Sequence, residues 1–334
     1  MKKLLIFGVI SIFMGAFNIA TATAAWPERD ITIVCFASPG GGTDTSNRVL
    51  AAALEPILKN PVKVVNMTGG LGGKATHFVW SARRDGYTWL GASESLLVLP
   101  TMGAFHTTTK DWEYFIFSGA PGPISVPEGS PYKTFEDLVK AVKAKPGEIK
   151  FSCSSAGSIW RIKLEVLKKY AGFDYKFIPF DGSAPSQVAA VAGEVDAVHT
   201  SIGEQTEMIR AGKLRPLVMI DPKPYDFPGY GKIPAITEFF PQLAKYLPLH
   251  QWLGVMLPKD LPKPILEKIT EAYKEALNSK TVKDYAKTTN STIYGLYGEE
   301  AKKMAEVEES VTNWFLFELG IGKKDPSTFG IPKP

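Results

Sequence analysis

The sequence predicts an α/β protein of two lobes, each built on a mostly parallel sheet that helices cover on both faces. The first observation is a repeated order of apolar strand, glycine- or serine-rich loop and helix. The second is a Pro- and Gly-rich break at 126–133, after which this order starts again. The third is the length of 334 residues, which exceeds what one hydrophobic core usually organises.

The first lobe is predicted to comprise 26–126 together with 252–334. Its helix-opening signal is Asp44, a residue type that often caps a helix N-terminus. The predicted strands are 31–36, 62–65, 87–91 and a returning strand at 253–257, and the predicted helices follow Asp44 and cover 75–82, 264–277, 281–287 and 299–317.

The second lobe is predicted at 127–251, with an irregular Pro- and aromatic-rich segment from 221 to 248. Hinge motion is expected near 126–133 and 249–254, where the chain crosses between the lobes. The predicted strands are 149–153, 175–179, 195–200 and 214–220, and the predicted helices are 135–143, 159–171 and 185–192.

The N-terminus predicts an export signal at 1–25. Lys2 and Lys3 precede an apolar stretch at 4–20, and Ala22-Thr23-Ala24 supplies the small residues of a signal-peptidase site. This stretch is too short for a membrane anchor. No later segment has about 18 apolar residues in a row. We therefore expect a periplasmic protein whose mature chain does not insert into the membrane.

Composition and motif spacing argue against nucleic-acid binding, a metal site and a GxSxG hydrolase. The chain has 38 Lys and Arg against 34 Asp and Glu, without a basic run, which argues against a nucleic-acid partner. Cys35 and Cys153 lie in apolar runs of different lobes, so two buried free thiols are expected rather than a disulfide. The four histidines show no metal-ligand spacing, and GxSxG is absent. No metal and no cofactor are predicted.

The loop from Ser38 to Asp44, with the sequence SPGGGTD, indicates an anion site. It follows the first strand and opens a helix, where unpaired backbone N–H groups and the helix dipole favour negative charge. It lacks the GxxxxGK[ST] pattern, and Asp44 stands where a phosphate would need a cation. Three glycines exceed what a tight turn requires. We interpret the loop as an anchor for an anion other than a nucleotide.

The loop from Gly70 to Ala75, with the sequence GLGGKA, matches a dinucleotide fingerprint, and Glu94 lies roughly 20 residues further on. However, the unit does not contain the first strand, and an exported protein meets little nicotinamide cofactor. We interpret this loop as a second backbone wall of the anion site. In the second lobe, the turns 154–158 and 180–183 open helices in the same way.

Trp160 and Arg161 follow the serine loop of the second lobe. Trp160 either packs in the core or stacks on a ligand. Arg161 is the best-placed guanidinium for a second ligand carboxylate, although a solvated helix position is the commoner role.

These loops, in this order, resemble the TctC/Bug family of periplasmic solute-binding proteins, the receptors of tripartite tricarboxylate transporters. The resemblance implies a two-lobe type II periplasmic-binding-protein fold and a ligand carboxylate held by loop amides, hydroxyls and water. Lys74, His77, Trp160 and Arg161 depart from the family's usual residues, so the ligand cannot be carried over. The segments that carry the resemblance are WPERDITIVCFASPGGGTDTSNRVLA, VVNMTGGLGGKAT, RRDGYTWLGASES, FSCSSAGSIWRIKLEVL, IPFDGSAPSQVAAVAGEVDAV and QWLGVMLPKDLPKPILEKI.

The sequence and the resemblance together predict a non-catalytic, monomeric receptor that delivers a small carboxylate to a membrane permease. The distal part of the ligand is expected to be aromatic or to carry a second carboxylate. Two alternatives are a receptor that presents its ligand to a sensor kinase and an exported serine hydrolase, which needs a Ser–His contact. The predicted ligand-binding residues are Ser38, Pro39, Gly40, Gly41, Gly42, Thr43, Asp44, Gly70, Leu71, Gly72, Lys74, Ser93, Ser154, Ser155, Gly157, Ser158, Trp160, Arg161, Phe180, Asp181, Gly182, Ser183 and Asp196.

Overall fold

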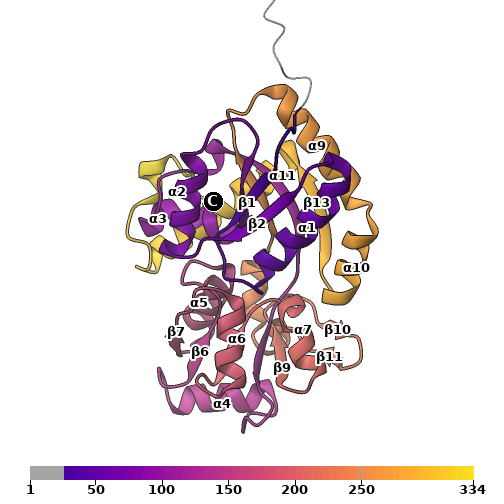
Figure 1. Cartoon of the computed structure of the whole chain (residues 1–334). Helices are drawn as coiled ribbons and strands as arrows, with labels where there is room; N and C mark the ends of the chain where they lie inside the picture. Colours follow the sequence, from indigo (N-terminus) through magenta and orange to yellow (C-terminus); the bar gives the residue numbers. More distant parts are fainter. Residues whose placement is uncertain (1–25, 248, 250) are drawn as a thin grey trace, which may run out of the picture.

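The computed structural model describes residues 26–247, 249 and 251–334, and it has two lobes that lie one above the other in Figure 1. The predicted export signal lies outside the described residues, as does His250. Each lobe is built on its own sheet, flanked by helices, so the predicted two-lobe α/β fold is confirmed. No helix among the described residues is long and apolar enough to cross a membrane.

The sheet of the first lobe has six strands in the order β13-β4-β12-β3-β1-β2. Strand β1 pairs in parallel with β2 and β3, whereas β12 and β13 pair antiparallel with their neighbours. The sheet is therefore mixed rather than mostly parallel, because β12 enters it from the second lobe. The strands are β1 (Ile31–Cys35), β2 (Val62–Asn66), β3 (Thr88–Ser93), β4 (Trp112–Gly119), β12 (Leu253–Pro258) and β13 (Thr292–Tyr297).

Helices cover both faces of this sheet because its strands bury side chains on both sides. Ile31 and Ile33 pack toward α1, α9 and α10, whereas Val34 packs toward α2 and α11, as the two-residue period of a strand requires. The helices are α1 (Gly42–Leu58), α2 (Gly73–Trp80), α3 (Leu99–Met102), α9 (Lys263–Leu277), α10 (Lys280–Thr289) and α11 (Gly298–Glu318), with short 3₁₀ helices η1 (Gly70–Gly72), η2 (Glu94–Val98), η3 (Thr109–Asp111) and η5 (Pro326–Phe329).

The sheet of the second lobe has five strands in the order β7-β6-β8-β5-β9 and is also mixed. The segment predicted to be irregular contains the hairpin β10–β11 and two short helices. The strands are β5 (Pro123–Pro127), β6 (Lys150–Ser152), β7 (Lys176–Ile178), β8 (Ala197–His199), β9 (Leu214–Met219), β10 (Tyr225–Phe227) and β11 (Gly231–Ile233), and the helices are α4 (Phe135–Ala144), α5 (Ile159–Ala171), α6 (Ser183–Val191), α7 (Ile202–Arg210), α8 (Ile236–Phe239) and η4 (Pro241–Tyr246).

The chain first crosses between the sheets at 120–122, a few residues before the predicted crossing at 126–133. Strand β5 already pairs inside the second sheet, which explains the difference. At Gly122 a Cβ atom would lie 2.6 Å from the Thr200 carbonyl oxygen and would overlap the Trp160 ring, so the crossing needs glycine. The lobe boundaries and hinge positions given above stay predictions.

The lobes also share an apolar contact. Val98, Met102 and Leu316 of the first lobe belong to the core cluster that surrounds Phe151 in the second.

Cys35 and Cys153 are buried and free, as expected. Burial raises the pKa of each thiol to about 12, so neither is a reactive thiolate at neutral pH.

Candidate functional site

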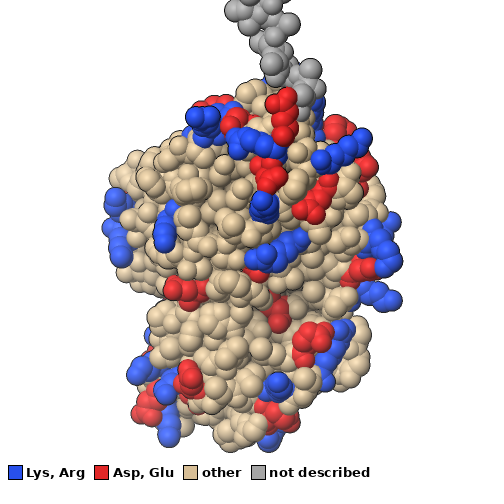
Figure 2. Space-filling view, viewed as in Figure 1, with Lys and Arg blue, Asp and Glu red and all other residues tan. Residues whose placement is uncertain are grey.

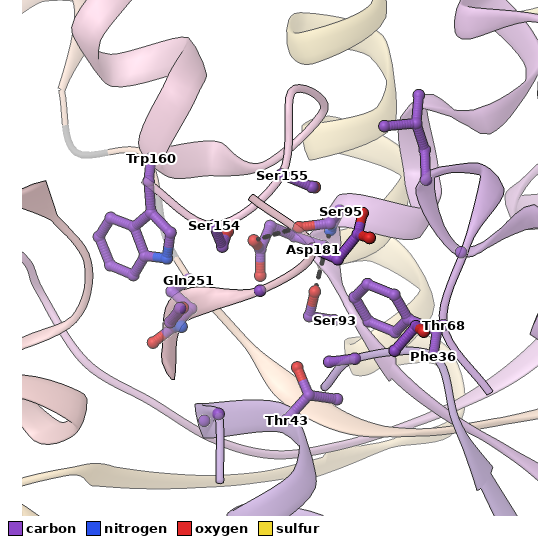
Figure 3. A pocket seen from close by; sticks show the side chains of 18 of the residues that line it. Phe36, Thr43, Thr68, Ser93, Ser95, Ser154, Ser155, Trp160, Asp181 and Gln251 are labelled. Atoms are coloured by element: carbon purple, nitrogen blue, oxygen red, sulfur yellow. Dashed lines mark hydrogen bonds between the residues drawn. The ribbon is translucent and has the colours of Figure 1, made fainter. Parts of the chain in front are cut away.

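A cleft lies between the two lobes (Figure 3). Its walls are mainly loops that follow strands and open helices, which is where α/β sheets commonly bind ligands. The lining residues are Phe36, Ala37, Gly41, Gly42, Thr43, Thr68, Gly69, Leu71, Gly72, Ser93, Glu94 and Ser95 from the first lobe, Ser154, Ser155, Trp160, Asp181, Gly182, Ser183 and Glu204 from the second, and Gln251 from the return crossing.

The first glycine loop supplies the N-terminus of α1, which begins at Gly42 with Gly41 as its cap residue. Asp44 was predicted to be the cap, but it lies in the first turn of the helix. It is buried, accepts the Gly40 N–H at 2.9 Å and pairs with Arg48. Burial alone would raise the pKa of Asp44, but hydrogen bonds from Arg48, Gly40 and Asn66 outweigh it and lower the pKa below its usual range.

Glu204 of α7 reaches across the cleft to this helix N-terminus. Its Oε1 atom accepts the Gly42 N–H at 2.7 Å. Its Oε2 atom accepts the N–H of Ser201 at 3.0 Å and the hydroxyl of Ser201 at 2.8 Å, which forms the capping box of α7. A backbone amide that we assigned to a ligand carboxylate thus holds a carboxylate from the facing lobe.

The second glycine loop forms the adjoining wall through Gly69, Leu71 and Gly72. Leu71 has a φ of 58° and Gly72 a φ of 95°, so the backbone here is left-handed over neighbouring residues. Lys74 is exposed and does not line the cleft. The turn presents backbone to the cleft, as the sequence predicts for a second wall.

Two turns of the second lobe complete the walls (Figure 3). Ser154 and Ser155 line the cleft, whereas Ser158 is the buried N-cap of α5 and accepts the Arg161 N–H. The other turn contributes Asp181, Gly182 and Ser183. Both lobes therefore place hydroxyl groups on the same cavity.

Trp160 both packs and lines the cleft. It is 1% exposed and meets the His199 ring edge-to-face with centroids 5.0 Å apart. Arg161 does not line the cleft: its guanidinium pairs with Glu165 at 2.5 Å and lies 3.9 Å from the centroid of the Phe177 ring. The geometry therefore does not support Arg161 as the partner of a second carboxylate, because Glu165 one helical turn further already neutralises it.

Asp196 lies just before β8, at the end of the strands away from the cleft. It precedes β8 and accepts the Lys150 N–H at 2.7 Å, whereas Ser154 and Ser155 follow β6, which runs parallel to β8. The predicted site therefore divides into two sets. The lining set is Gly41, Gly42, Thr43, Leu71, Gly72, Ser93, Ser154, Ser155, Trp160, Asp181, Gly182 and Ser183. The set outside the lining is Ser38, Pro39, Gly40, Asp44, Gly70, Lys74, Gly157, Ser158, Arg161, Phe180 and Asp196.

The most important lining residues missing from the predicted set are Glu94 and Glu204. Glu94 is buried, and its carboxylate accepts the Ser95 hydroxyl at 3.1 Å and the Trp252 N–H at 3.2 Å. Burial raises the pKa of Glu94 to about 7, although hydrogen bonds partly offset this rise. For Glu204 a signal was available, because Ser201-Ile-Gly-Glu204 is a capping-box pattern at a helix start. Thr68, Gln251 and Phe36 carried no comparable signal.

The cleft is acidic. Glu94, Asp181 and Glu204 line it, and no Lys, Arg or His side chain is among its described lining residues. On the face shown in Figure 2, acidic side chains are visible at the centre of the waist between the lobes. A ligand anion would therefore be bound by backbone N–H and hydroxyl groups rather than by an ion pair.

The histidine and metal-ligand arrangements that an exported hydrolase would use can be checked among the described residues. His199 is fully buried, with Nδ1 2.9 Å from the Pro123 carbonyl oxygen, and burial lowers its pKa to about 3. No Ser–His hydrogen bond occurs among the described residues. They also contain no group of three or more His, Cys, Asp or Glu side chains arranged to hold a metal ion.

Known proteins resemble this chain in sequence and in fold. A family model described as the tripartite tricarboxylate transporter family receptor, TctC, matches residues 46–314. BugT of Bordetella pertussis is 30% identical over 285 residues, which cover 82% of this chain and 85% of BugT.

Two solved structures, each 22% identical in sequence, share the fold. Rpa4515 of R. palustris, solved with adipate, superposes with a TM-score of 0.79 over 89% of this chain and 99% of that one. MatC of Rhodopseudomonas palustris, solved with malate, superposes with a TM-score of 0.77 over 87% of this chain and 100% of MatC. The family model covers most of the chain, and the resemblance drawn from the sequence is confirmed. The chain belongs to the TctC family of tripartite tricarboxylate transporter receptors.

Proposed function

We propose that the chain is a periplasmic receptor that binds a small carboxylate in the cleft between its lobes and delivers it to a membrane permease. The observation that carries the proposal is the N-terminus of α1, whose first-turn N–H groups open onto a cleft that contains serine hydroxyls from both lobes. The receptor acts as a monomer and without catalysis.

The carboxylate anchor consists of neutral donors. The N–H groups of Gly42 and Thr43 have no acceptor within α1, because the first turn of a helix lacks intrahelical partners, and the Gly42 N–H donates to Glu204 instead. The hydroxyl groups of Ser93 and Ser154 lie on the facing walls. Adipate in Rpa4515 and malate in MatC support a carboxylate as the ligand class.

The distal part of the ligand meets Trp160. Its indole lines the end of the cleft beside Gln251, as Figure 3 shows. An aromatic or apolar distal group suits this surface. A second carboxylate would have to rely on hydroxyl and amide donors there, because Arg161 is paired with Glu165.

A thermal-shift screen of the purified protein tests the proposal. The panel contains acetate, malate, adipate, citrate and benzoate, with the corresponding primary amides as uncharged controls. At a concentration of about 100 times Kd, binding stabilises the folded state by about 2.7 kcal/mol, which raises Tm by roughly 4 °C for a chain of this size. The proposal fails if no acid stabilises the protein more than its amide does.

A further inference from the structure

The contact between Glu204 and Gly42 joins two helices of different lobes at the anchor itself. The residues are 162 positions apart in the sequence, and the Gly42 nitrogen lies 2.7 Å from Oε1. A Cβ atom on Gly42 would lie 2.6 Å from that oxygen, so only glycine lets the carboxylate come this close. The third glycine of the SPGGGTD loop is therefore explained by Glu204.

The bond has the chemistry expected of a ligand carboxylate at this position. It joins an ionisable carboxyl group to a backbone N–H at a helix N-terminus, where the helix dipole favours negative charge. The Gly42 amide has a single hydrogen, which makes one strong bond. A ligand carboxylate can use that hydrogen only when Glu204 releases it.

Charge adds to this competition. Asp181 and Glu94 also line the cleft, and its described lining contains no basic side chain. A second carboxylate beside Glu204 is therefore repelled unless one of the two moves away. Glu204 can release Gly42 and still keep hydrogen bonds, because the N–H and hydroxyl of Ser201 donate to its other oxygen.

We propose that Glu204 is a built-in competitor for the carboxylate anchor, so that a ligand carboxylate binds by exchange with it at the Gly42 N–H. Glu204 then determines affinity and specificity: it weakens binding of simple carboxylates and favours ligands whose remaining contacts outweigh the exchange. This inference rests on the proposed function, since it concerns the same anchor.

The test is an acetate titration of ¹⁵N-labelled protein, followed at the backbone amide of Gly42. Acetate is the minimal carboxylate, so it reports on the anchor without distal contacts. Four proteins are compared: wild type, Glu204→Gln, Glu204→Ala and Glu207→Gln. Glu207 lies on the same helix, is 78% exposed and pairs with Arg210, so its variant removes the same charge without touching the anchor.

The proposal predicts a Kd for acetate about tenfold lower in Glu204→Ala than in wild type, with Glu207→Gln unchanged. Glu204→Gln keeps a side-chain oxygen near Ser201, so it provides the comparison if the alanine variant does not fold. It should also bind acetate more tightly, by a smaller factor.

Equal or weaker acetate binding in both Glu204 variants would overturn the proposal. Weaker binding would show that Glu204 supports the ligand. If acetate shifts the Gly42 amide in none of the proteins, this amide is not a carboxylate anchor and the proposal is wrong. The receptor function would still stand in that case if a member of the thermal-shift panel stabilises the protein, so the two failures are distinguishable.

Discussion

Replacing Gly42 by Ala should separate the lobes at the α1 N-terminus, and the cost can be worked out from the structure. The new Cβ would lie 2.6 Å from Oε1 and 2.9 Å from Cδ of Glu204, so the carboxylate has to leave. A hydrogen bond to a charged group contributes about 1.5–3 kcal/mol. Replacing glycine by alanine at a helical position stabilises the protein by about 0.4–1 kcal/mol, because alanine lowers the conformational entropy of the unfolded chain. We therefore expect a net loss of about 1–2 kcal/mol in the free energy of unfolding.

A double-mutant cycle with Glu204→Ala isolates this contact. In the Glu204→Ala background the clash is gone, so Gly42→Ala should be neutral or slightly stabilising. Urea unfolding of the four proteins, followed by Trp fluorescence, gives the coupling free energy, which we expect to be about 2 kcal/mol. A coupling below about 0.5 kcal/mol would show that Gly42 and Glu204 do not interact, because independent sites add within that margin.

Three further predictions concern other residues of the site. Glu94→Gln should flatten the pH dependence of stability: the pKa of about 7 exceeds the ordinary 4.5, so the contribution of Glu94 is full below pH 4.5 and is lost as the pH rises toward 7. Chemical unfolding at pH 5 and pH 8 should show wild type losing more stability than the variant, and equal losses would contradict the burial argument. Asp196→Asn should leave carboxylate affinity unchanged by calorimetry, because the residue precedes β8, at the end of the strands away from the cleft. Trp160→Ala should cost about 3–5 kcal/mol of stability through its cavity, whereas a cost below 1 kcal/mol in urea unfolding would show that the indole does not pack as described.

The fold was largely readable from local patterns. Apolar runs such as 31–36 and 253–257 coincide closely with strands, because a strand buried on both faces needs continuous apolar side chains. Strand direction was less accessible. No residue pattern within β12 indicates that it runs antiparallel to its neighbours, since its direction depends on where the chain returns from the second lobe.

The site was predictable where backbone forms it. The glycine loops can be recognised directly in the sequence, and Gly42 and Gly72 line the cleft as expected. Side chains were harder, because their direction depends on partners. For example, the sequence left the role of the Arg161 side chain open, and the structure pairs its guanidinium with Glu165, four residues further along the same helix. Glu204 was missed because the contact with Gly42 exists only after two distant helices meet.

The most direct test of the account is a calorimetric titration of malate and adipate into wild type, Gly41→Asp and Gly129→Asp. Gly41 has ordinary helix-cap dihedral angles and space for a Cβ atom, so its variant should fold while placing a carboxylate at the anchor. Gly129 is exposed with no atom within 4 Å of the position of a Cβ, which makes it the matched control. We predict binding of at least one acid to wild type and Gly129→Asp and none to Gly41→Asp. Unchanged affinity in Gly41→Asp would show that the N-terminus of α1 is not the carboxylate anchor.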